Sequence, residues 1–206
     1  MSNALKAKRK KMVPLGYSKA ELVGIQNYCR KNNRQENIIV KTYQDIKLIS
    51  LQILHDKFGF GLKRISRLEN GINQCLEKNA DRDLGASHYE IYLKEKCDFS
   101  ITEEINKIPY RERVMFCFEK FPDAKTAIEA GKLVAAAFYN YIALSCTVLK
   151  EAFKVSGRQL LEYIEWIRYY VNSIATRRET MLGVASVLYY ECKYLDARFE
   201  GKFYEV

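Results

Sequence analysis

The chain has 206 residues, and 48% of them are hydrophobic, which excludes a disordered protein and allows one compact domain or two small ones. It carries 34 Lys and Arg residues against 25 Asp and Glu residues, and the net charge of +9 favours an anionic partner. Because only 10 Gly and 3 Pro residues interrupt the sequence, we expect an all-α protein.

The N-terminal part begins with a basic segment, residues 1–13, that lacks apolar periodicity and is predicted to be a flexible arm. The pattern Ser18-x-x-Glu21 is typical of a capping box and predicts a helix to about Arg30, followed by a polar loop over residues 30–36. The pattern of residues 37–41 is compatible either with a short strand or with a segment that leads into a helix over residues 42–57. We favour the helix.

A Phe-Gly-Phe-Gly turn at residues 58–61 ends that helix and precedes an amphipathic one. The apolar positions of the second helix are spaced by three or four residues, so they share one face: Leu62, Ile65, Leu68, Ile72 and Leu76. The pattern leaves open whether this helix stops at Asn70 or continues to Lys78. Ser87-x-x-Glu90 predicts a further helix toward Lys96.

The apolar pattern of the second half of the chain predicts three long helices. The first, over residues 123–155, is apolar nearly all round and is expected to be the central helix of a bundle. Its least polar run, residues 133–149, is too short and too polar for a membrane span. The other two helices show packed seams over residues 160–174 and 181–195. We therefore predict an N-terminal helical domain over residues 14–110 and a C-terminal three-helix bundle over residues 111–206.

The turn carries a pattern of Leu54, Phe58, the turn glycine Gly59 and Phe60, followed by Ile-Ser-Arg-Leu-Glu-Asn-Gly at residues 65–71. Over residues 49–71 this pattern resembles the helix-turn-helix of phage repressor and Cro-like DNA-binding domains. The resemblance implies that the second helix presents its polar face to DNA. The same residues could instead form a plain corner between two packed helices.

A second resemblance covers the run His-Asp-x-Phe-Gly-Phe-Gly-x-Lys-Arg at residues 55–64. This run is similar to a segment of uncharacterised proteins from phages and mobile elements of low-GC Gram-positive bacteria. It implies a phage-borne protein of the host cytosol. Such a protein binds nucleic acid or disables a host protein, for example as an anti-CRISPR protein that inhibits a defence nuclease.

Positive charge is concentrated toward the N-terminus. Residues 1–110 hold 20 Lys and Arg residues against 13 Asp and Glu residues, whereas residues 111–206 hold 14 against 12. This asymmetry favours a nucleic acid, with DNA as the leading hypothesis, as the partner of the arm and the turn. The candidate nucleic-acid-binding residues are Lys8, Arg9, Lys10, Lys11, Lys57, Lys63, Arg64, Ser66, Arg67 and Asn70.

Tyrosines gather on the last two predicted helices, where an apolar ring with a polar tip suits either core packing or a partner surface. Under the rival hypothesis, in which the chain docks on a host nucleic-acid-processing protein, the bundle supplies the contact, and it could also form a homodimer. The candidate partner-binding residues are Tyr163, Arg168, Tyr169, Arg177 and Arg178.

Catalysis and cofactors find no support in the sequence. The six cysteines include no Cys-x-x-Cys pair, and His55 and His88 are the only histidines, so no metal site is predicted. We interpret His55 as a hydrogen-bonded packing residue. Phosphate-binding loops and nucleophile motifs are missing, so we expect no enzyme and no cofactor. The absence of a signal-peptide pattern and the scattered cysteines predict a cytoplasmic protein with reduced thiols and no membrane association.

Overall fold

The computed structural model describes residues 19–82, 86–118 and 127–203, and within these ranges it holds eight α-helices, one short 3-10 helix and no strand. The all-α prediction is therefore confirmed. The chain divides into two compact units, Met1–Asn37 and Ile38–Val206. The predicted basic arm, with Lys8, Arg9, Lys10 and Lys11, lies outside the described residues.

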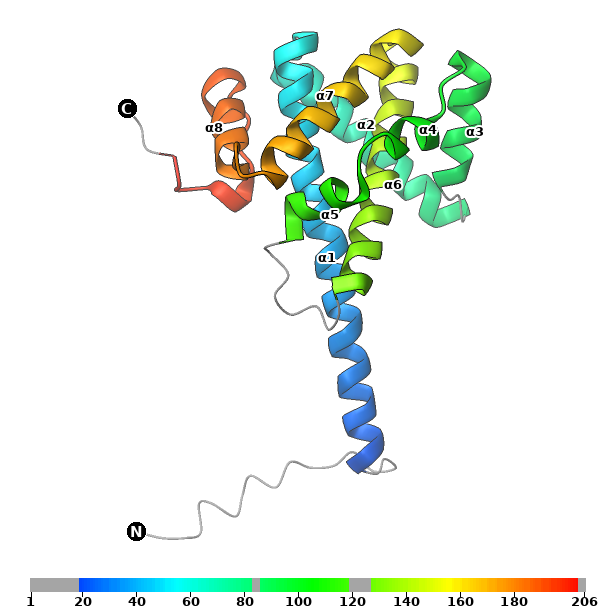
Figure 1. Cartoon of the computed structure of the whole chain (residues 1–206), viewed down its shortest axis with the longest axis vertical. Coiled ribbons are helices and arrows are strands. Elements are labelled where there is room, and N and C mark those ends of the chain that lie inside the picture. Colours follow the sequence, from blue (N-terminus) through cyan, green and yellow to red (C-terminus); the bar gives the residue numbers. More distant parts are fainter. Residues whose placement is uncertain (1–18, 83–85, 119–126, 204–206) are drawn as a thin grey trace. The chain divides into compact units, whose positions relative to one another are not determined.

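Figure 1 shows the helices in chain order. In chain order they are α1 (Lys19–Phe58), α2 (Leu62–Arg82), α3 (Ala86–Cys97), α4 (Ile101–Asn106), α5 (Tyr110–Phe118), α6 (Ala127–Phe153), α7 (Gly157–Ala175), α8 (Met181–Cys192) and the 3-10 helix η2 (Ala197–Phe199).

The predicted loop over residues 30–36 and the alternative strand over residues 37–41 are wrong, because α1 is helical through both segments. The segment is polar, but it contains neither Gly nor Pro, and Arg, Lys, Gln and Glu are good helix formers. Polarity alone therefore does not end a helix here. The favoured helix over residues 42–57 is the last part of α1.

Helix α6 is central to the unit Ile38–Val206, and the backbones of α2, α3 and α5 pack against it (Figure 1). One hydrophobic core runs from Ile38 to Phe199 and includes residues of all eight helices. The predicted domain boundary near residue 110 does not separate two cores, because α6, from the predicted C-terminal bundle, packs against α2 and α3 of the predicted N-terminal domain.

By length and composition, the stretch Ile128–Phe153 of α6 could cross a membrane, with a mean hydropathy of 1.4 in its most apolar window. However, 67% of that window is buried inside the fold, where it contacts other helices. The core helix of a folded protein has the same properties, and this burial is compatible with a soluble protein.

The predicted seams of the last two long helices correspond to α7 and α8. Ser156 caps α7 in a capping box with Gln159, and Thr180 caps α8 by accepting a hydrogen bond from the amide of Gly183. Two short helices for which the sequence gives no clear signal, α4 and α5, follow Cys97.

Candidate nucleic-acid interface on helix α2

The turn between α1 and α2 is built around one glycine with a positive φ. Gly59 has φ +64°, a conformation that costs little without a Cβ atom. Its amide donates a hydrogen bond to the carbonyl of His55 over 3.1 Å, and the amide of Phe60 donates to the carbonyl of Leu54 over 2.9 Å. These bonds end α1 at Phe58 and place the start of α2 at Leu62. The predicted helix end at Phe58 and Gly59 matches the structure.

Helix α2 has a buried face and an exposed one. Ile65 and Leu68 are fully buried and Ile72 is 5% exposed. The four residues predicted to form the polar face lie on the exposed side, because their spacing of three or four residues returns to the same side of a helix. These residues are Lys63, Ser66, Arg67 and Asn70.

The helix does not stop at Asn70 and Gly71 but continues to Arg82, which answers the question left open by the sequence. Gly71 has another role. A Cβ atom built on it would lie 2.6 Å from Cγ1 of Val148, so the glycine allows α2 to cross α6 at close range. Leu62 and Leu76, the first and last positions of the predicted stripe, are 43% and 39% exposed, so only the middle of the stripe is buried.

The exposed face of α2 borders a hollow with a volume of about 660 Å³. The hollow has amide, hydroxyl and cationic side chains on its α2 side and reaches Ala152 of α6. The sequence analysis did not predict Gln74, because the helix-turn-helix pattern ends at Gly71. Its place one helical turn after Asn70 could have indicated it. The lining residues are Leu62, Lys63, Ser66, Arg67, Asn70, Gly71, Gln74 and Ala152.

The cations beside this hollow are exposed and form no ion pair within the part of the chain that the structure describes. Two of them lie over a pair of aromatic rings whose centroids are 4.9 Å apart, Phe60 and Phe153. The guanidinium carbon of Arg64 is 5.6 Å from the ring centroid of Phe60, and that of Arg67 is 5.2 Å from the centroid of Phe153. Such contacts orient an arginine while its hydrogen-bond donors stay available to a ligand.

The nearest acid in the sequence, Glu69, is held away from these cations. Its Oε1 atom accepts hydrogen bonds from Nζ of Lys47 over 3.1 Å and from the hydroxyl of Tyr194 over 2.7 Å. Glu69 is only partly exposed, and these partners belong to α1 and to the segment after α8. The carboxylate therefore does not neutralise the exposed face of α2.

The structure does not bring Lys57 into this group. Its ammonium nitrogen lies 3.9 Å from the ring centroid of Trp166 on α7, and it does not line the hollow. The candidate interface is therefore made by residues of α2 together with the aromatic pair beneath its arginines.

The candidate partner-binding residues divide into a buried one and four exposed ones. Tyr163 is fully buried, and its hydroxyl forms hydrogen bonds with Ser50 over 2.5 Å and with Ser145 over 3.2 Å. The prediction that Tyr163 contacts a partner is therefore wrong, since its polar tip is satisfied inside the core. The exposed residues are Arg168 and Tyr169 on α7, and Arg177 and Arg178 in the turn after it.

Comparisons with protein-family models, with curated proteins and with solved structures found no match. The fold defines the chain as an all-α protein.

Proposed function

We propose that the protein binds nucleic acid, with duplex DNA as the leading ligand, through the exposed face of α2. The observation that carries this proposal is the set of exposed cations without ion pairs, Lys63, Arg64 and Arg67, of which Lys63 and Arg67 line a hollow together with hydroxyl and amide groups. Cations supply phosphate contacts, whereas Asn and Gln amides can bond to base edges.

The roles within the interface follow from side-chain chemistry. Lys63, Arg64 and Arg67 bind phosphates and fix the position of α2 on the nucleic acid. Ser66, Asn70 and Gln74 point from the same helix face and are the candidates for base contacts. The basic arm adds attraction to phosphates that does not depend on sequence.

The test is DNA binding measured by fluorescence anisotropy at several salt concentrations, with labelled random duplex and single-stranded DNA. The variant Lys63→Glu, Arg64→Glu, Arg67→Glu should lose most of its affinity. The matched control is Lys94→Glu, Lys96→Glu, Lys132→Glu, which changes the net charge equally at exposed positions on α3 and α6. Circular dichroism of both variants checks that they remain folded.

A milder variant, Lys63→Gln, Arg64→Gln, Arg67→Gln, should flatten the dependence of log K on log salt by about 3, because each lost phosphate contact removes roughly 0.9 from the slope on duplex DNA. Equal affinity in the charge-reversed variant and its matched control would contradict the proposal. So would a wild-type protein that binds no nucleic acid at low salt.

A second candidate function, docking on a host defence nuclease, is favoured by one observation on α7. Tyr169 is 59% exposed, and its ring packs edge-on against Trp166 and Tyr170, with centroids 5.7 Å and 5.6 Å away. Exposed aromatic groups of this kind are enriched in protein interfaces. Loss of a co-purifying nuclease from Arg168→Ala, Tyr169→Ala protein, with DNA binding unchanged, would support this second function.

A further inference from the structure

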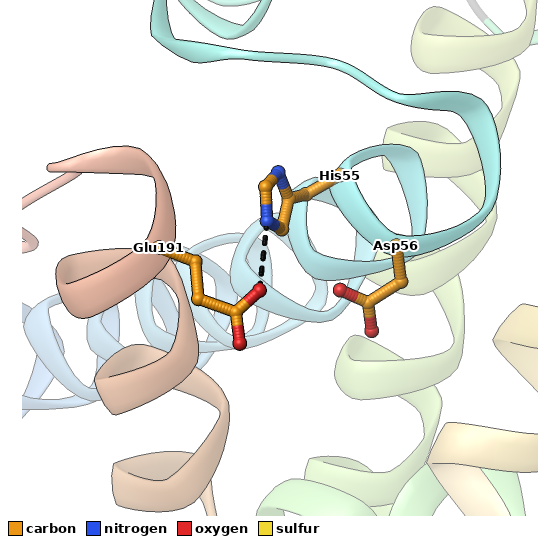
Figure 2. Close-up of side chains that lie close together, drawn as sticks. All are labelled: His55, Asp56 and Glu191. Carbon is orange, nitrogen blue, oxygen red and sulfur yellow. Dashed lines mark hydrogen bonds and ion pairs between the residues drawn. The ribbon is translucent and has the colours of Figure 1, made fainter.

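Three side chains with metal-ligating atoms converge where the end of α1 meets the end of α8. His55 and Asp56 belong to the last turn of α1, and Glu191 lies one residue before the end of α8. Figure 2 shows that the three side chains point toward one another from the two helices. Their ligand atoms all lie within 4.8 Å of one another.

The ring of His55 is held in the orientation that metal-binding histidines use. Its Nδ1 atom lies 3.0 Å from the carbonyl oxygen of Phe60. A carbonyl only accepts hydrogen bonds, so Nδ1 carries the hydrogen and the lone pair of the neutral ring is on Nε2. Without a metal ion, Nε2 of the charged ring donates to Oε2 of Glu191 over 3.1 Å, and a metal ion would take the place of that proton. A histidine ligand is commonly fixed in this way by a backbone carbonyl behind it.

The carboxylate of Asp56 is also positioned by a second group. Its Oδ2 atom accepts a hydrogen bond from the hydroxyl of Tyr170 on α7 over 3.1 Å. The other oxygen, Oδ1, remains able to bind a cation. Two of the three side chains therefore have a neighbour that orients them, which is the outer-shell arrangement typical of metal sites.

The electrostatics of this place favour a cation. The carboxylates of Asp56 and Glu191 approach each other at the C-terminal ends of α1 and α8, and a helix C-terminus carries partial negative charge. Two carboxylates and two helix ends thus concentrate negative charge around the lone pair of His55.

We propose that Nε2 of His55 and the carboxylates of Asp56 and Glu191 bind one divalent transition-metal ion, with Zn²⁺ as the best fit. Zinc bonds to nitrogen and oxygen ligands are about 2.0–2.2 Å long, so two ligands of one ion lie roughly 3 Å apart, close to the separation of Nε2 and Oε2. Imidazole suits Zn²⁺ and related ions, whereas Mg²⁺ and Ca²⁺ require oxygen ligands.

The ion would join α8 to the turn at the start of α2. The carbonyl of Phe60, which orients His55, belongs to that turn, and Glu191 belongs to α8. With three protein ligands, the remaining coordination positions would be filled by water. None of the three metal ligands is assigned to DNA binding, so loss of DNA binding would not contradict the metal site, nor the reverse.

Isothermal titration of chelator-treated full-length protein with Zn²⁺, and with Mg²⁺ for comparison, tests the proposal at pH 7.5. We expect one site for Zn²⁺ and none for Mg²⁺. Glu191→Gln and Asp56→Asn should each weaken Zn²⁺ binding by about tenfold or more, and Tyr170→Phe by roughly tenfold through loss of the bond to Asp56. Glu191 is 59% exposed, so Glu191→Gln should leave the fold intact.

The matched control is His88→Asn, because His88 is exposed and is the only other histidine of the chain. A Co²⁺ spectrum separates this site from binding by the cysteines, since thiolate ligands add a strong charge-transfer absorption. The proposal predicts a cobalt spectrum without that absorption, unchanged in His88→Asn and lost in His55→Asn. Absence of Zn²⁺ binding, binding that Glu191→Gln leaves unchanged, or a thiolate absorption would each overturn it.

Discussion

His55 connects three parts of the fold through one ring. Nδ1 donates to the carbonyl of Phe60 in the turn, and Nε2 meets the carboxylate of Glu191 on α8. Burial opposes the charged ring, but the Phe60 carbonyl and the carboxylates of Glu191 and Asp56 favour it, and together they raise the pKa of His55 above its ordinary value of 6.5. The sequence expectation that His55 forms hydrogen bonds agrees with these contacts.

This raised pKa predicts a pH-dependent stability in metal-free protein. The charged ring is favoured in the folded state, so its stabilisation is complete below about pH 6.5, the unfolded pKa, and is lost as pH rises through the higher folded pKa. Urea unfolding of wild type and His55→Asn, with a chelator present, should therefore differ most at low pH. His88→Asn serves as the control. A difference that does not change with pH would contradict the prediction.

Tyr163 shows why single residues are hard to place from sequence. A tyrosine on an amphipathic helix has the same local pattern whether its hydroxyl meets solvent, a partner or the core. Its partners here are Ser50 on α1 and Ser145 on α6, which are far from it in the sequence. No local spacing relates these residues, so only the packing of α1, α6 and α7 assigns Tyr163 to the core.

At the scale of elements, helices with regular apolar spacing were predictable and their ends were less so. The stripe of α2 was readable because Ile65, Leu68 and Ile72 repeat at helical spacing and are buried. The C-terminus of α2 could not be predicted, because glycine commonly ends a helix and Asn70-Gly71 fits that pattern. Its actual role depends on Val148 of α6, which the sequence of α2 cannot reveal.

The crossing of α2 and α6 predicts the effect of Gly71→Ala. A methyl group there would overlap the buried side chain of Val148, and overpacking costs about 1–3 kcal/mol. Replacing a helix glycine recovers about 1 kcal/mol, so we expect a net loss of roughly 1 kcal/mol in the free energy of unfolding. Chemical denaturation measures this loss.

The double variant Gly71→Ala, Val148→Ala isolates the contact. Relative to Val148→Ala alone, the added methyl group should be neutral or stabilising, since the space is then open. Gly61→Ala is the matched control, because no heavy atom lies within 4 Å of its Cβ position and its φ is not positive. A stabilising Gly71→Ala in the wild-type background would show that the crossing tolerates the methyl group.

For the whole molecule, the composition was enough to predict the all-α class. It did not predict that all eight helices contribute to one core. The sequence predicts a domain boundary near residue 110, but α5 starts at Tyr110 and packs against both α6 and α7. For the candidate interface, the polar face of α2 was predictable from helical spacing. The hollow beside it was not, because it also depends on Ala152 of α6.

Within the unit Ile38–Val206, a buried ion pair joins the segment after α8 to α1. Asp45 on α1 is fully buried, and its Oδ1 atom accepts a hydrogen bond from Arg198 of η2 over 2.7 Å. The same guanidinium donates to Asp196 over 2.9 Å and to the carbonyl of Gln44 over 3.0 Å. One side chain near the C-terminus thus bonds to two consecutive residues of α1.

Arg198→Ala should therefore lower the free energy of unfolding by about 3 kcal/mol, because it removes the guanidinium from a buried carboxylate. Arg198→Lys should recover only part of the loss, since an ammonium cannot bond to Asp45, Asp196 and the Gln44 carbonyl together. Arg158→Ala, at an exposed position on α7, is the control and should change stability by less than about 0.5 kcal/mol. Urea denaturation compares the three variants, and equal values for Arg198→Ala and Arg158→Ala would mean that the ion pair does not hold the C-terminal segment to α1.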